Sequence, residues 1–185
     1  MIIDKTYFLS GELFIPNAND GNMGSSIESN LDIVIKRYER QLLLDALGVE
    51  LYNELETAMD DLQNADQKWQ YLVNGTDYTI SGVKYRWDGL KGKNKDGLLA
   101  HYVYCMYLRQ DEIDYSTTGM KRNAVENAIR ASFTEKYVQS WCAFIKMYQG
   151  DNEVNRSLKQ FLEDMESDYP LDGFKCYGNV NRFGI

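Results

Sequence analysis

His101 and Cys105 are the two side chains whose types and spacing best suit chemistry in this sequence. They lie four residues apart, so on a helix they share one face, and two further ligands would complete a metal site. His101 is the only histidine among 185 residues, and apolar residues flank it on both sides. A buried histidine with satisfied hydrogen bonds beside a buried thiol is the interpretation we favour, and a metal site is the alternative.

Other patterns that carry catalysis or bind phosphate are missing from the sequence. The chain has no second histidine to serve as a general base, and no Glu-x-x-His pair of the kind that builds two-metal sites in helical bundles. It contains neither the P-loop motif nor the dinucleotide-binding glycine motif. We therefore predict a protein that is not an enzyme and that uses no cofactor or metal.

One basic cluster stands out against an acidic background. The chain carries 20 Lys and Arg against 28 Asp and Glu, a formal net charge of -8. This balance disfavours wide binding to nucleic acid through phosphate contacts. The cluster is either an exposed, solubilising loop or a surface that meets an acidic partner or a nucleic-acid backbone. Its members are Lys84, Arg86, Lys91, Lys93 and Lys95.

The last residues form a second candidate site, because they place apolar side chains on a segment too short to have its own core. The segment 171–185 contains glycines and aromatic residues and has no helical period. Aromatic side chains on an extended arm suit anchoring in a partner, and docking back on the same domain is an equal alternative. The predicted anchors are Phe174, Tyr177, Phe183 and Ile185.

The elements that must position these residues are mainly helical. The two prolines, Pro16 and Pro170, leave the region between them free of the strongest helix breaker. β-Forming residues around Ser81-Gly82 predict one small hairpin over about 76–87. Apolar residues at steps of three and four predict helices over about 25–46, 51–62, 97–114 and 125–150, and a fifth helix that begins after 151.

Several boundaries within this plan depend on single residues. Ser25 with Glu28 forms a capping box for the first helix, and Gly48 bends or ends that helix. Asp151 is the predicted cap of the fifth helix, whose buried face includes Val154. The helix around His101 is apolar nearly all round, which predicts that it is the buried central helix.

The length fits one domain with arms. We expect an N-terminal arm and linker over 1–24, a helical domain over 25–170 and an extended tail over 171–185. Three scattered cysteines provide no disulfide framework, and no signal peptide or membrane-spanning stretch is visible, so a soluble protein made in the cytoplasm is expected. The predicted fold class is mainly α: a bundle of about five helices with one small β-hairpin insertion and extended terminal arms.

Three stretches of the sequence resemble a known family. The run from Tyr38 to Gly48, continuing through Leu55, is similar to the first helical pair of head-tail connector proteins from tailed bacteriophages. The segments Arg86-Trp87-Asp88-Gly89-Leu90 and Leu98 to Tyr104 are similar in order and spacing to versions from phages of Bacteroides-type hosts, including crAss-like phages. The resemblance covers about 27–150 and rests on packing motifs.

The resemblance implies a structural virion protein. Members of this family are small helical bundles that form a ring, commonly of twelve copies, beneath the portal, and they extend the DNA channel into the neck. It implies a homo-oligomeric ring as the assembly, with the portal and other neck or tail proteins as partners. DNA would pass without sequence-specific binding, and no membrane would be involved. The expected location is the virion neck, after assembly in the host cytoplasm.

Two alternatives of other classes remain open at this point. The first is a cellular helical module that binds a protein partner and has no catalytic activity. The second is an enzyme with a metal at His101 and Cys105. The five basic residues are assigned to a loop that faces a neighbouring ring or the channel, and the aromatic tail residues are assigned to partner binding.

Overall fold

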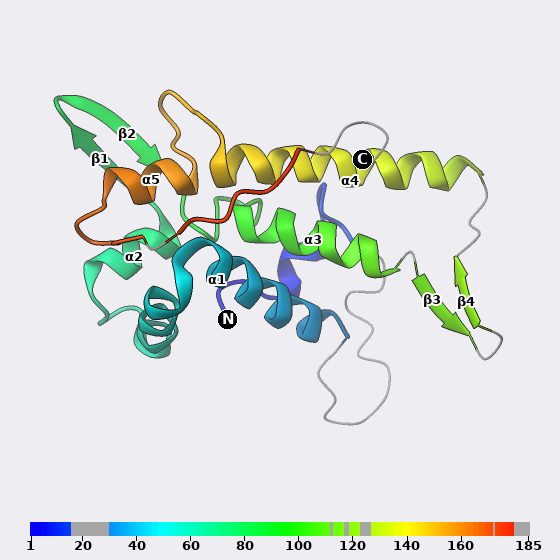
Figure 1. Ribbon diagram of the computed structural model, residues 1–185. Helices are drawn as coiled ribbons and strands as arrows, with labels where there is room; N and C mark the ends of the chain where they lie inside the picture. The colour runs from blue at the N-terminus through cyan, green and yellow to red at the C-terminus, as the bar shows by residue number, and fades with distance from the viewer. Residues whose placement is uncertain (16–29, 112, 117–118, 123–126, 172, 180–185) are drawn as a thin grey trace.

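The computed structural model confirms a mainly helical protein with a small antiparallel β-hairpin (Figure 1). It describes residues 1–15, 30–111, 113–116, 119–122, 127–171 and 173–179. The helices among these residues are α1 (Asn30–Ala58), α2 (Gln67–Asn74), α3 (Leu98–Asp111), α4 (Asn127–Gln149) and α5 (Leu158–Asp164), with 3-10 turns η1 (Lys5–Phe8) and η2 (Met59–Asp61). The strands are β1 (Thr76–Ile80), β2 (Val83–Trp87), β3 (Ile113–Ser116) and β4 (Gly119–Arg122).

Helix α3 is the buried centre of the bundle. It packs against α1 on one side and α4 on the other, and Figure 1 shows it between these two helices. Every residue from Leu98 to Met106 is buried. The prediction of a buried central helix is therefore confirmed. The reason is that a helix that is apolar on all sides has no polar face to expose to solvent.

Helix α1 bends at Gly48, as the sequence predicts. Gly48 has a φ of 76°, which lies in the left-handed region and interrupts the helical path within Asn30–Ala58. Buried leucines lie on both sides of the bend, among them Leu47 and Leu51. The bend therefore lets both halves of α1 contribute to one core.

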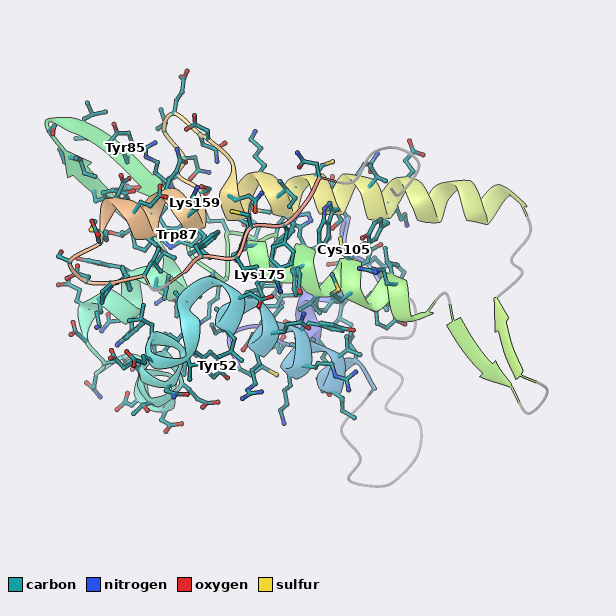
Figure 2. The ribbon with its side chains drawn as sticks, viewed as in Figure 1. Tyr52, Tyr85, Trp87, Cys105, Lys159 and Lys175 are labelled. Atoms are coloured by element: carbon teal, nitrogen blue, oxygen red, sulfur yellow. The ribbon has the colours of Figure 1, made fainter. Side chains whose placement is uncertain are left out.

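The β1–β2 hairpin occupies the predicted range. Thr76 pairs with Trp87 at its base and Ile80 with Val83 at its tip. The base is fixed to the helices, because the Trp87 indole N–H donates to the carbonyl of Leu72 at 3.1 Å and the ring stacks on Phe161 at 5.4 Å. Figure 2 shows Tyr85 on this hairpin and Trp87 near its junction with the bundle.

The start of α5 differs from the prediction. Ser157, not Asp151, caps the helix, and it forms a capping box with Gln160. Val154 is 63% exposed and does not belong to the buried face. The reason is that the segment before the helix pairs with β2: Arg86 N donates to Val154 O at 3.0 Å, and Arg156 N donates to Arg86 O at 2.7 Å.

A second hairpin, β3–β4, stands where the sequence was interpreted as the end of the central helix. That helix ends at Asp111 and not at Asp114, and Ile113 pairs with Arg122. The run Ile113-Asp114-Tyr115-Ser116 alternates apolar and polar residues, which is a strand period. Figure 1 shows this hairpin apart from the bundle, between the ends of α3 and α4.

Residues 1–15 belong to the core although the sequence suggests an arm over 1–24. Five of their side chains are buried: Ile2, Ile3, Phe8, Leu13 and Ile15. The buried carboxylate of Glu39 on α1 accepts hydrogen bonds from the backbone N–H groups of residues 2 and 3 at 2.8 to 3.1 Å. The predicted capping box at residues 25 and 28 lies outside the described residues.

Two glycines permit a close backbone contact at the foot of the hairpin. A Cβ on Gly89 would lie 2.5 Å from the backbone of Asn74 and of Gly75, and a Cβ on Gly75 would lie 2.5 Å from Trp87 O. Both glycines also have positive φ. The end of α2 and the turn after β2 can touch only because neither residue has a side chain.

We predict that Gly89→Ala lowers the free energy of unfolding by more than about 2 kcal/mol, because the methyl group adds a backbone clash to the cost of a positive φ. Urea unfolding followed by circular dichroism measures the change. Gly82→Ala is the matched control, since Gly82 has a similar φ of 85° but open space around its Cβ position. The control is expected to lose about 1 kcal/mol. Equal losses in the two variants would contradict the close-contact explanation.

Candidate functional site

The five basic residues of the predicted cluster differ in their surroundings. Lys84 is exposed on β2. Arg86, two residues on, is neutralised by Asp88 at 2.8 Å and by Asp77 at 3.3 Å. The positive charge of Arg86 is therefore largely balanced by these two carboxylates, and Arg86 adds little to a positive surface.

The lysines of the loop before α3 also have separate environments. The Lys95 ammonium donates to the Thr6 hydroxyl at 2.8 Å, so it ties this loop to the N-terminal segment. Lys91 is half-buried, and its positive charge acts on the buried carboxylate of Glu39. Lys93 is exposed and borders a cleft. Lys84, Lys93 and Lys95 are all exposed, and of these three Lys95 is bonded to Thr6.

The cleft beside Lys93 has a volume of about 840 Å³. Its walls come from the loop between β2 and α3, the first turn of α3, the end of α4 and the segment before α5. Both charge signs are present. The cationic residues are Lys93, Lys146 and Arg156, and the acidic residues are Asp88, Asp96, Asp151 and Glu153.

Most of these charges already have partners within the chain. Asp88 accepts from Arg86 and also from the Asn155 amide at 2.6 Å. The guanidinium of Arg156 lies 3.2 Å from Asp164 and 3.9 Å above the centre of the Tyr85 ring. The polar groups of the cleft therefore hold its own walls together more than they converge on a ligand.

His101 contributes to this cleft through a hydrogen-bonded chain. Its Nε2 lies 2.6 Å from Asp96 Oδ1, and its Nδ1 lies 2.8 Å from the hydroxyl of Ser140 on α4. An aspartate, a histidine and a serine are the parts of a hydrolytic triad, but here their order in space is reversed. The serine is only 5% exposed and does not line the cleft, whereas the carboxylate is exposed. A catalytic triad needs its serine at the substrate. We therefore interpret the Asp96–His101–Ser140 hydrogen bonds as a structural link between α3 and α4.

Burial lowers the pKa of His101 below its ordinary 6.5, and the nearby negative charge of Asp96 opposes that shift. His101 is thus the buried histidine with hydrogen bonds at both nitrogens that we favoured from the sequence. Cys105 is also buried, and burial raises the pKa of its thiol to about 12. A thiol that keeps its proton at neutral pH is a poor nucleophile and a poor metal ligand. The described ranges contain no group of three or more His, Cys, Asp and Glu side chains arranged to hold a metal ion.

The described part of the tail packs on its own domain. The tail, red in Figure 1, runs across the bundle between α1 and α4. Phe174 lies 4.6 Å from Tyr148, centre to centre, and Tyr177 lies among four aromatic rings. For these two residues the geometry is that of docking back on the same chain. Phe183 and Ile185 lie outside the described residues, and their partner-binding role stays a prediction.

Asp45 and Gln149 bind the tail, and neither is among the site residues predicted from the sequence. Asp45 accepts from the Tyr177 hydroxyl at 2.6 Å and from the Lys175 ammonium at 2.8 Å. The side-chain amide of Gln149 accepts a hydrogen bond from the backbone N–H of Tyr177 at 2.7 Å and donates one to its backbone carbonyl at 2.8 Å. In the sequence Asp45 is one acid within a helix and Gln149 is the last residue before a glycine. A polar residue beside the apolar stripe was the only available signal.

Comparison with protein-family models, with curated proteins and with solved structures finds no match. Within the described ranges, no helix has both the length and the hydropathy needed to cross a bilayer. What the protein does therefore has to be inferred from its own residues.

We predict that the imidazole of His101 titrates below pH 6.5 in the folded protein. Burial penalises the charged ring, so the unfolded chain binds this proton more readily, and the associated stability is complete above about pH 6.5 and falls as the pH drops. Because His101 is the only histidine, a single imidazole resonance followed by NMR between pH 4.5 and 8 reports it directly. A midpoint at or above 6.5 would show that Asp96 outweighs burial.

We predict that Tyr177→Phe lowers the free energy of unfolding by about 1–3 kcal/mol, because it removes a hydrogen bond to a carboxylate in a half-buried site. Thermal and urea unfolding measure the loss. Tyr71→Phe is the matched control, since the Tyr71 hydroxyl accepts its hydrogen bond from the exposed Gln67 amide and the residue is 36% exposed. The control is expected to change by less than about 0.5 kcal/mol. A similar small change for Tyr177 would mean that the tail is not held through Asp45.

Proposed function

We propose that this protein is a structural subunit of the head-tail connector ring of a tailed bacteriophage, and that it has no catalytic activity. The ring would join the portal to the next neck or tail protein and would continue the DNA channel. In this role the protein acts through its shape and its contacts. Its location would be the virion neck, after assembly in the host cytoplasm.

The observation that carries the proposal is that the three stretches on which the resemblance rests form one packed unit. The ring of Tyr38 on α1 lies edge-on to that of Tyr102 on α3, with centres 6.3 Å apart. Leu90 of the second stretch is fully buried in the same hydrophobic core cluster as Leu42 of the first and Leu98 of the third. The order and spacing of these residues therefore belong to the core, which is the part of a sequence that a shared fold constrains.

The β3–β4 hairpin supports assembly with neighbouring copies. Figure 1 shows it away from the helices, joined to the bundle through the ends of α3 and α4. An isolated two-stranded hairpin is marginally stable in water, so packing on another chain would stabilise it. A head-to-tail contact of this kind closes into a ring when the rotation between copies is a simple fraction of a turn.

The charge of the chain supports a conduit that does not grip DNA. A net charge of -8 repels the phosphate backbone, and the basic residues at 86 and 95 are engaged within the chain. The exposed Lys84 and Lys93 are the ones we assign to a neighbouring ring or to the channel. Phe183 and Ile185 remain the proposed anchors for the portal or for another neck protein.

Electron microscopy of the full chain mixed with the portal protein encoded beside it tests the proposal. We expect a ring stacked coaxially on the portal. A variant in which residues 113–122 are replaced by a Gly-Ser linker is expected to keep its helical circular dichroism and lose the ring. Gly82→Ala, at the tip of the other hairpin, is the control that should still assemble. No association with the portal, together with a gene neighbourhood without portal and capsid genes, would favour a cellular partner-binding module.

A further inference from the structure

The tail and the surface beneath it have the features of a peptide and its receptor. The tail segment is 173–179. The tail-binding surface is formed by residues of α1, α3 and α4: Asp45, Tyr102, Trp141, Phe144, Tyr148 and Gln149. Figure 2 shows Lys175 on the tail where it crosses the bundle.

Backbone recognition is unusually complete for a segment outside any helix or sheet. Gln149 pairs with the N–H and the carbonyl of Tyr177, as a neighbouring strand would. The Trp141 indole donates to Gly178 O at 2.9 Å, and the Tyr148 hydroxyl donates to Lys175 O at 3.0 Å. The N–H of Lys175 donates to the backbone carbonyl of Asp45 at 3.0 Å. These bonds fix the register of an extended chain.

Side chains add specificity to this backbone recognition. The Tyr177 ring lies 5.3 to 5.9 Å from the rings of Tyr102, Trp141, Phe144 and Tyr148. Its hydroxyl and the Lys175 ammonium meet on one carboxylate oxygen of Asp45. The tail-binding surface therefore recognises the pattern Phe-Lys-x-Tyr, which Phe174, Lys175 and Tyr177 supply.

The tail is tied to the rest of the chain by a short linker. Tyr169 is buried, its ring packs on Trp69 and Phe161, and its hydroxyl donates to Lys68 O. Only residues 170–173 separate this anchor from Phe174. The five Cα–Cα steps from Tyr169 to Phe174 span at most about 18 Å, so a tail that left its own surface could reach only a copy packed directly beside α2 and α5.

We propose that the tail-binding surface is an exchange site, which the tail of the same chain fills in the free protein and the tail of an adjacent copy fills in an assembly. The only ligand whose fit the structure shows is this chain's own segment, so the matching occupant is the identical segment of a second copy. Exchange of an identical element costs little, because the contacts made are the contacts given up. This inference applies to any assembly of the chain and does not rest on the connector role.

Effective concentration decides which tail is bound. A short flexible tether holds its ligand at an effective concentration on the order of 1 mM, so a dilute chain binds its own tail. When copies stand side by side, the neighbouring tail is present at a similar concentration and competes. The free subunit therefore keeps its aromatic surface covered until another copy is in place.

Complementation between two full-length variants tests the exchange. Tyr177→Ala damages only the tail, and Gln149→Ala damages only the surface. Neither chain alone can make an intact tail–surface contact, but in a mixture the intact tail of the Gln149→Ala chain fits the intact surface of the Tyr177→Ala chain. Gln149→Ala removes two hydrogen bonds to the tail backbone, and Tyr177→Ala removes the buried ring and its bond to Asp45. Each loss weakens the defective contacts by about 30-fold or more, which favours the intact contact between chains.

We expect sedimentation velocity of the equimolar mixture, at about 100 µM of each chain, to show a heterodimer that neither variant forms alone. The control mixture is wild type with the double variant Tyr177→Ala/Gln149→Ala, in which no intact contact between the chains is possible. A mixture that stays monomeric, or a control that associates equally, would overturn the proposal. Circular dichroism checks folding, and Lys175→Ala with Asp45→Asn is the second pair if a first variant does not fold. The test contains no portal, so its failure would leave the connector proposal to its own experiment.

Discussion

The structure depends on covering α3. The nine residues of α3 from Leu98 to Met106 are all buried, so this helix cannot lie at a surface and neighbouring elements must cover it. Two helices, α1 and α4, cover most of it. The N-terminal segment also contacts α3 through η1, and the Tyr177 ring of the tail lies against Tyr102. Both ends of the described chain thus serve the same core as the helices.

Two carboxylates on α1 fasten these ends. Glu39 holds the backbone of residues 2 and 3, and Asp45 holds the tail at Lys175 and Tyr177. Burial raises the pKa of Glu39, while the backbone N–H groups that it accepts from lower it. A buried carboxylate that is fully hydrogen-bonded fixes one position of the incoming chain more sharply than an apolar contact would, because its donors must lie at defined points.

The polar groups near the cleft beside Lys93 serve a similar structural purpose. The Asp96–His101–Ser140 chain joins the loop before α3, α3 itself and α4, and Arg86 with its acidic partners stabilises the foot of the hairpin. Groups engaged in this way have little capacity left for a substrate. The proposed contacts with other chains use other parts of the molecule: the β3–β4 hairpin, the exposed lysines and the tail with its receptor.

The fold class, the buried central helix, the bend at Gly48 and the hairpin at 76–87 could all be predicted from the sequence, because each depends on periodicity or turn chemistry that is local in the chain. The sequence also indicated that His101 is a buried, hydrogen-bonded residue. The capping of α5 by Ser157 could not be predicted in this way, since the pairing of residues 154–156 with Arg86 joins segments about 70 residues apart. The same holds for the roles of Glu39, Asp45 and Gln149. A polar side chain beside an apolar stripe looks like an ordinary surface residue until the fold brings a distant backbone against it.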